Sequence, residues 1–266
     1  MKSEIIIASP AGNITVFVIN PPVDDQSRIL LVNSLMADSA LKAEQLGFVI
    51  PPESPQALWT LEMMGGEFCG NAIRSFGLLA AQKSGFKGKA SIMVKVSGVN
   101  RPLKVDVDML SGDAQTEIPL PLAELSIDLD SRTFPFYVFE GISHVIIEDL
   151  SLDMYLAQEL LKLADETVKS SGFSKLSACG FMFYDSKKNF LEPLVWLRTT
   201  GIFVLESSCG SGSAALAIHL ARNFDNIDKT LEISQAGGTI RTHIKKCKGQ
   251  IQLLTIGGTV TYDKYQ

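Results

Sequence analysis

The sequence predicts a mixed α/β (α+β) protein made of two similar lobes, and two observations support this. Short apolar runs separated by glycine and asparagine turns occur along most of the chain, with a few helical stretches between them. A cysteine-glycine turn followed by an apolar helix occurs twice, at Cys69 in the first half and at Cys209 in the second. The 266 residues, 46% of them hydrophobic, are enough to bury a substantial core.

The first half opens on strands. Residues 5–18 are mainly apolar and are interrupted only by the turn sequence 10–13, so we expect two extended runs joined by a turn. A helix is expected within residues 27–41. Residues 57–63 alternate, with Ala57, Trp59, Leu61 and Met63 on one face, and this alternation predicts a further strand.

The clearest helix lies in the second half, over residues 152–169. Leu152, Leu156, Leu160 and Leu163 recur at helical spacing, and Gly172 follows as a stop signal. Two more helices are predicted to begin directly after Cys69 and Cys209.

The C-terminal residues 231–262 consist of short apolar runs between turn signals, which predict an antiparallel meander. The expected turns are at Gly237-Gly238, Lys248-Gly249 and Gly257-Gly258. We place the N-terminal lobe at residues 1–122 and the C-terminal lobe at 123–257. The two are joined near the polar, proline-containing stretch 117–132.

Composition excludes several classes of partner and site. A net charge of −5 argues against binding to nucleic acid or to an anionic membrane. The sequence has neither an apolar run of about 20 residues nor a signal peptide, so we expect a cytoplasmic protein. Its four cysteines include no Cys-x-x-Cys pair, and no residue group has metal-ligand spacing or forms a glycine-rich phosphate loop. We therefore expect reduced thiols, no metal and no cofactor.

The two cysteine motifs indicate proton-transfer chemistry at carbon. Each places a thiol just before a helix, where unpaired backbone N–H groups and the helix dipole favour an anion and lower a thiol's pKa. Inverting a stereocentre without a cofactor needs a base on one face of the α-carbon and an acid on the other. Cys69 and Cys209, one from each lobe, are predicted to form this pair.

Two alternatives remain at this point. Either cysteine alone is equally compatible with a buried structural role, because cysteine is among the most buried residue types. A nucleophilic cysteine is the other possibility, but it needs an orienting base beside it. The sequence does not place His144, His219 or His243 near either thiol.

These motifs resemble those of the diaminopimelate epimerase-like racemases, which work without pyridoxal phosphate. The resemblance is carried by residues 9–13, 67–72, 208–212 and 235–238. It implies two pseudo-symmetric lobes, each a curved, mostly antiparallel sheet around a central helix, with the active site between them. It also implies that a C-terminal strand of about residues 258–266 returns to the first lobe.

Departures from the family pattern bear on the substrate. Diaminopimelate epimerases carry a Glu-Arg pair before the second cysteine, which grips a distal carboxylate, whereas residues 199–202 here are Thr-Thr-Gly-Ile. Residues 44–48, 65–72 and 94–98 are similar to the histidine racemase branch associated with opine-type metallophores. Histidine is therefore the expected substrate. Diaminopimelate, another amino acid, and a catalytically silent amino-acid-binding protein are the alternatives.

The resemblance also suggests which residues contact the substrate, although capping alone explains the polar residues at helix starts and turns. The catalytic residues are Cys69 and Cys209, and the expected substrate-binding residues are Asn13, Gln45, Gly70, Asn71, His144, Glu206, Gly210 and Ser211. Glu67 stands two residues before a thiol, where it would moderate the acidity of that thiol. His219, Cys179 and Cys247 are predicted to be structural. The expected partner is an amino acid, with a homodimer allowed and neither nucleic acid nor membrane expected.

Overall fold

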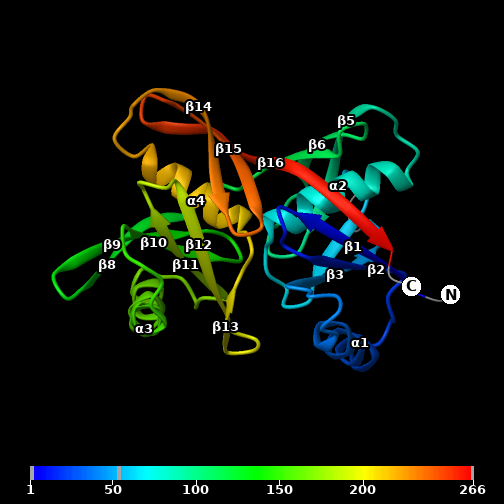
Figure 1. Cartoon of the computed structure of the whole chain (residues 1–266), viewed down its shortest axis with the longest axis horizontal. Coiled ribbons are helices and arrows are strands. Elements are labelled where there is room, and N and C mark those ends of the chain that lie inside the picture. The colour runs from blue at the N-terminus through cyan, green and yellow to red at the C-terminus, as the bar shows by residue number, and fades with distance from the viewer. Residues whose placement is uncertain (1–2, 53–54, 265–266) are drawn as a thin grey trace. The chain divides into compact units, whose positions relative to one another are not determined.

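The computed structural model describes residues 3–52 and 55–264. The chain divides into two compact units, described here one at a time (Figure 1). Unit 1 comprises Met1–Glu117 and Ile256–Gln266, and unit 2 comprises Ile118–Thr255. Both are dominated by strands, and the fold is of the mixed α+β class.

Unit 1 is a closed β-barrel around one helix. Its elements are β1 (Glu4–Pro10), β2 (Thr15–Ile19), α1 (Asp25–Ala37), β3 (Gln45–Ile50), β4 (Thr60–Met63), α2 (Gly70–Lys83), β5 (Lys89–Val96), β6 (Leu103–Asp108), β7 (Asp113–Glu117) and the end of β16 (Gln250–Lys264). The seven strands follow one another in chain order, and β16 pairs with both β7 and β1. This last pairing closes the sheet, so the barrel leaves no edge between β1 and β7.

Helix α2 packs against β1, β5, β6 and β7, which places it inside this barrel (Figure 1, cyan). Its residues from Gly70 to Ala81 are buried all round, as expected of a helix that is apolar on every face. Gly77 allows close packing, because a Cβ there would lie 2.5 Å from a methyl of Val105 on β6. Helix α1 packs outside, on β3, with Asp24 as its N-cap.

Unit 2 is a sheet with a helix on each face. Its elements are β8 (Ala123–Leu129), β9 (Arg132–Val138), β10 (Ser143–Glu148), α3 (Met154–Ser170), β11 (Ala178–Asp185), β12 (Phe190–Leu197), β13 (Ile202–Leu205), α4 (Gly210–Leu220), β14 (Ile227–Gln235), β15 (Gly238–Cys247) and the start of β16. The strand order is β16-β15-β14-β12-β11-β10-β9-β8. Strand β13 lies off this path and pairs with β12.

Along β10 and β11, successive side chains point to opposite faces of this sheet. Val145 and Ile147 of β10, with Phe181 of β11, join the core that α3 covers with Leu160 and its neighbours. The residues between them face the other way, toward α4. Thus His144 of β10 reaches a residue of α4, and this alternation brings β10 to the second cysteine motif.

Most of the predicted elements are confirmed. The turn at residues 10–13 joins β1 to β2, and α2 and α4 begin directly after the two cysteines. Helix α3 lies within two residues of its expected bounds, whereas α1 begins two residues before the range 27–41 and ends at Ala37. The pairs Gly237-Gly238 and Lys248-Gly249 lie at the turns that flank β15.

Two expectations were wrong. The strand predicted over residues 57–63 begins only at Thr60, because Pro51-Pro52 ends the partner strand β3 at Ile50. The third glycine pair lies inside β16 instead of at a turn. Gly258 is extended there with φ +147, a conformation open mainly to glycine, and its carbonyl accepts a hydrogen bond from buried Arg74.

No helix within residues 3–52 and 55–264 is long and apolar enough to cross a membrane.

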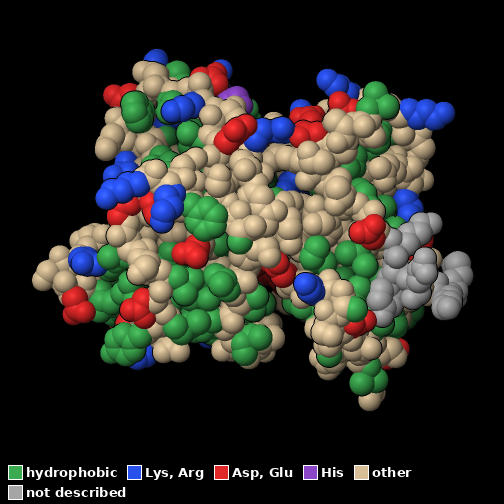
Figure 2. Space-filling view, viewed as in Figure 1, with side chains coloured by type: hydrophobic (Ala, Val, Ile, Leu, Met, Phe, Trp, Pro, Cys, Tyr) green, Lys and Arg blue, Asp and Glu red, His purple; other side chains and the backbone are tan. Residues whose placement is uncertain are grey.

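On the surface of unit 2, Figure 2 shows hydrophobic side chains gathered where β13 and α3 lie in Figure 1. Ile202 and Leu205 of β13, together with Tyr155 of α3, are exposed there.

Candidate active site

Cys69 stands at the N-terminus of the buried helix in unit 1. It is the N-cap of α2, in extended conformation with φ −129° and ψ 115°. Its sulfur accepts a hydrogen bond from the Ala72 N–H at 3.3 Å, and its carbonyl accepts one from the Ile73 N–H. The half-buried thiol therefore lies against the first turn of the helix, where a thiolate is favoured by the N–H groups and the helix dipole.

Cys209 has the same backbone geometry at the N-terminus of α4 in unit 2. It is the N-cap, with φ −125° and ψ 113°, and its carbonyl accepts a hydrogen bond from the Ser213 N–H. It is buried, and it makes no side-chain cap to the helix. Its sulfur lies 3.7 Å from the Ser211 hydroxyl instead. Gly70 and Gly210, predicted to border the substrate, are the first residues of the two helices.

Gln235 fixes the backbone of Cys209. Its buried side-chain carbonyl accepts a hydrogen bond from the Cys209 N–H at 2.8 Å, and its amide group donates to the Ser213 hydroxyl at 2.9 Å. That hydroxyl donates in turn to the Cys209 carbonyl at 2.7 Å. The sequence marked Gln235 only as the start of a glycine turn, and its position beside the second cysteine motif could not be read from spacing.

His144 joins the same group from β10. Its Nε2 lies 2.9 Å from the Ser211 hydroxyl oxygen, so the structure brings together three of the predicted residues: His144, Ser211 and Cys209. The imidazole ring stands edge-on to Phe139, with ring centroids 5.9 Å apart. Its strand neighbour on β11 is Gly180, where a Cβ would lie 2.4 Å from His144 Nδ1. Only glycine leaves room for the imidazole at that position.

His144 is neutral in the folded protein. The side chain is fully buried, and this desolvation lowers the pKa of His144 to about 3. In the unfolded chain a histidine titrates near 6.5, so below that pH the unfolded state binds a proton that the folded state does not. His144 therefore destabilises the fold as pH falls from about 6.5 toward 3.

This predicts acid sensitivity that depends on one residue. Between pH 7 and pH 5 the free energy of unfolding is expected to fall by about 2 kcal/mol through His144 alone. His144→Gln, which cannot titrate, should lose that part of the pH dependence, whereas the control His243→Gln, at a half-buried histidine of β15, should keep it. Urea unfolding of the three proteins at both pH values measures the difference. Equal pH dependence in all three would contradict the assignment of a neutral buried His144.

In unit 1 the structure brings Asn13 and Gln45 together. Asn13 is completely buried; its side-chain oxygen accepts a hydrogen bond from Gln45 Nε2, and its Nδ2 donates to a Glu44 carboxylate oxygen at 2.7 Å. Asn13 therefore ties the β1–β2 turn to the start of β3.

Glu67 is buried two residues before Cys69. Its burial raises the pKa of Glu67, more than the N–H groups of Glu67 and Gly65 lower it, and favours the neutral carboxylic acid. One carboxyl oxygen, Oε2, has no hydrogen-bond partner among the described residues. Burial therefore opposes a negative charge on Glu67, two residues before the thiol of Cys69 in the chain.

Asn71 sits in the first turn of α2 and is also engaged within the protein. Its side-chain oxygen accepts a hydrogen bond from Arg74 Nε at 3.2 Å, and its carbonyl accepts one from the Ser75 hydroxyl. Arg74 is completely buried and donates on to the Gly258 carbonyl of β16 at 2.8 Å. Neither Arg74 nor Ser75 was identified from the sequence, because their partners come from a distant strand and from the helix itself.

The remaining predicted residues are Glu206 and those expected to be structural. Glu206 follows β13 and is half-buried, with its N–H donating to the Pro193 carbonyl. Cys179 belongs to the core under α3, where burial raises the pKa of its thiol, and Cys247 is exposed at the end of β15. His219 is buried on α4 with its Nε2 3.2 Å from a Glu148 carboxylate oxygen.

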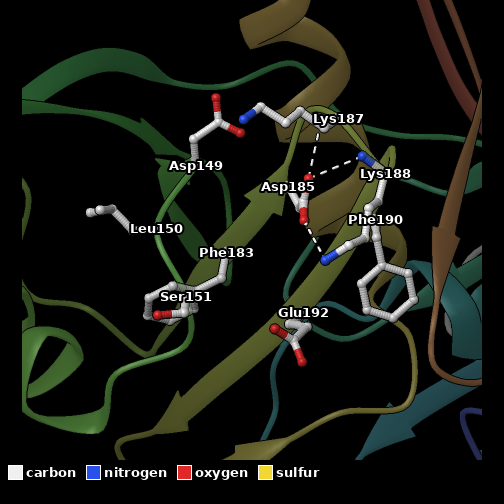
Figure 3. Close-up of a pocket in the computed structure, with 9 residues that line it drawn as sticks. All are labelled: Asp149, Leu150, Ser151, Phe183, Asp185, Lys187, Lys188, Phe190 and Glu192. Atoms are coloured by element: carbon white, nitrogen blue, oxygen red, sulfur yellow. Dashed lines mark hydrogen bonds and ion pairs between the residues drawn. The ribbon is translucent and has the colours of Figure 1, made fainter.

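Unit 2 also contains a cavity of about 540 Å³, drawn in Figure 3, whose lining includes no residue of the cysteine motif. Residues lining it include Asp149, Asp185, Lys188 and Phe190, at the neighbouring ends of β11 and β12. One ion pair lies in its lining, with the Lys188 ammonium 2.9 Å from the Asp185 carboxylate. None of the predicted site residues lines it. Within the described part of the chain, no group of three or more His, Cys, Asp or Glu side chains is arranged to hold a metal ion.

Comparison with known proteins identifies the family. A family profile described as "Histidine racemase CntK N-terminal domain" matches residues 3–263. A histidine racemase of Fusobacterium nucleatum is 32% identical over 240 residues, which cover 88% of this chain and 86% of the relative. A histidine racemase of Staphylococcus aureus is 27% identical over 262 residues, covering 95% and 92%.

Solved structures show the same fold at low sequence identity. A probable proline racemase from Agrobacterium radiobacter K84 superposes with a TM-score of 0.70 at 12% identity, over 100% of this chain and 93% of that one. The fold is thus that of a wider group, whereas the family assignment rests on the sequence matches. Because the profile spans almost the whole chain, the protein belongs to the family described as the histidine racemase CntK N-terminal domain.

Proposed function

We propose that this protein is a histidine racemase in which Cys69 and Cys209 exchange a proton with the α-carbon from opposite faces, without a cofactor. The observation that carries the proposal is the equivalent backbone placement of the two thiols. Each is the N-cap of a buried helix, and their backbone angles agree within a few degrees. Membership in the histidine racemase family supports histidine as the substrate.

The reaction needs one thiolate and one thiol. The thiolate takes the α-proton, the C–H bond breaks, and its electron pair is delocalised into the carboxylate group. The opposite thiol then delivers its proton to the other face of the α-carbon. One thiol and one thiolate remain with their roles exchanged, so the enzyme is ready for the reverse direction.

The helix ends have a second role in this proposal. The α-carboxylate of the amino acid would be held by N–H groups at the start of the helices, which also stabilise charge as the α-proton leaves. In this proposal one unit supplies Cys69 and the other supplies Cys209. The proposed substrate contacts are the side chains or backbone of Asn13, Gln45, Gly70, Asn71, Glu206 and Gly210. His144 and Ser211, also expected from the sequence to bind substrate, form a hydrogen-bonded series to the sulfur of Cys209 instead.

The side chain of histidine suits a site without a carboxylate clamp. Residues 199–202 lack the Glu-Arg pair expected for diaminopimelate, and burying a distal carboxylate without a partner is costly. A neutral imidazole carries no such cost. Diaminopimelate or a third amino acid remains the alternative substrate, and a silent amino-acid-binding protein the alternative function.

The test is turnover in heavy water. L-Histidine incubated with the purified protein is expected to give D-histidine carrying one deuterium at the α-carbon, detected by chiral chromatography and mass spectrometry. The kcat/KM for histidine should exceed that for diaminopimelate by about 100-fold, equal to about 2.7 kcal/mol. Activity should survive chelation, and the protein should show no pyridoxal absorbance.

Three results would overturn parts of this proposal. Higher kcat/KM on diaminopimelate or on a third amino acid would refute histidine as the substrate while leaving the two-thiol chemistry in place. Tight binding of histidine without α-exchange would favour the binding protein. Loss of activity on chelation, restored by a metal ion, would refute cofactor independence.

A further inference from the structure

Three residues of unit 2 form a short hydrogen-bonded series that ends on the sulfur of Cys209. His144 Nε2 lies 2.9 Å from Ser211 Oγ, and Ser211 Oγ lies 3.7 Å from Cys209 Sγ. The first distance is that of an ordinary hydrogen bond, and the second falls within the range of bonds to sulfur. What this series does depends on which atoms carry the protons.

The surroundings of His144 decide its tautomer. The neutral imidazole carries one N–H, and Nδ1 is buried with no hydrogen-bond partner among the described residues. A proton on Nδ1 would be an unsatisfied buried donor, which is rare in proteins, while an unprotonated Nδ1 leaves only an unsatisfied acceptor. The Nε2–H tautomer is therefore favoured, and it donates to Ser211 Oγ.

The direction of the hydrogen bond from His144 to Ser211 determines where the hydroxyl proton of Ser211 points. With its oxygen accepting from His144, the Ser211 hydroxyl has its own proton available for the sulfur of Cys209. A hydrogen bond to a thiolate is stronger than one to a neutral thiol, so it favours the charged form. The packing holds the series in place, because glycine at 180 and at 212 lets β11 and α4 close on His144 and Met182.

We propose that His144 and Ser211 are positioning residues for the thiolate of Cys209: neutral His144 donates to the Ser211 hydroxyl, which donates to the sulfur. The inference rests on the proposed function for its purpose, but its geometry lies wholly within unit 2. It changes the role expected from the sequence, where both residues were substrate contacts. It also makes the two thiols chemically unequal, since Cys69 accepts from a backbone N–H instead.

The test measures the thiolate directly, without substrate. The rate of iodoacetamide alkylation of Cys209, resolved by peptide mass spectrometry, is followed against pH. Ser211→Ala is expected to raise the midpoint of this profile by about one pH unit, equal to about 1.4 kcal/mol. Ser213→Ala is the matched control, because its hydroxyl contacts the Cys209 carbonyl and not the sulfur. The control should leave the midpoint unchanged.

Variants at His144 test the donor. His144→Gln retains an N–H near the Nε2 position and should keep the midpoint close to that of the parent, whereas His144→Leu should raise it. If the leucine variant does not fold, nitrogen NMR of the parent protein decides the tautomer. The Nε2–H form is expected from pH 5 to pH 8.

Kinetics separates positioning from substrate binding. Ser211→Ala should lower kcat about 10-fold with little change in KM. A raised KM with an unchanged alkylation midpoint would return Ser211 to the substrate contacts and overturn the proposal, as would an Nδ1–H tautomer. Because the alkylation and NMR experiments use no substrate, a protein that fails to racemise histidine but shows the shifted midpoint refutes only the proposed function.

Discussion

Replacing either Cys69 or Cys209 with serine is expected to lower kcat for histidine racemisation by about 1,000-fold. Serine is close to cysteine in size, and at position 69 it can still accept the cap bond from the Ala72 N–H. Its hydroxyl, however, is far less acidic than a thiol, so it serves poorly both as base and as acid in the exchange at the α-carbon. The effect should fall on kcat, measured by chiral chromatography, with little change in KM.

The control is Cys247→Ser, which alters an exposed thiol at the end of β15 and should leave kcat unchanged. Circular dichroism and thermal unfolding show whether each variant is folded. If Cys69→Ser or Cys209→Ser turned over histidine at a rate close to that of the parent, the two-thiol mechanism would be wrong. Loss of activity in only one of them would leave a single-base mechanism.

Gly98→Ala, which adds one methyl group near the first thiol, is expected to lower the free energy of unfolding by about 3 kcal/mol. We expect no other added methyl group near this thiol to be as destabilising. Gly98 has φ +76, and a Cβ there would lie 2.4 Å from the Phe68 backbone nitrogen. Backbone cannot move aside as a flexible side chain can. The neighbouring Ser97 hydroxyl donates to the Glu67 carbonyl, so this turn supports the segment that ends at Cys69. Activity should fall with stability.

Gly66→Ala is the matched control for this prediction. Gly66 also has positive φ, +73, and stands on the same segment, but a Cβ there would have nothing within 4 Å. Gly66→Ala should lower the free energy of unfolding only by the strain of the backbone conformation, about 1 kcal/mol. Urea unfolding of the two variants against the parent isolates the contact with Phe68. Equal destabilisation would show that backbone strain alone matters at both positions.

The features that the sequence determined by itself are local ones. A cysteine-glycine turn followed by an apolar helix specifies where Cys69 and Cys209 stand, because capping and helix formation depend on neighbours within a turn or two. The same holds for α1, α3 and the turns flanking β15. Local signals failed where pairing decides the outcome, as at residues 57–59, whose partner strand is ended by prolines, and at Gly257-Gly258, which β16 runs through.

The residues that surround each thiol were decided only by the tertiary structure. His144, Gln235 and Cys209 come from β10, the end of β14 and the start of α4, and nothing in their spacing predicts that they meet. Their meeting depends on strand register. A shift of β10 by one residue would turn His144 into the core under α3 and place Ser143 or Val145 beside Ser211. Register is set by burial across the whole sheet, which no short stretch of sequence contains. The proposed chemistry therefore rests on two local motifs, while the environment of each thiol depends on the folded sheet.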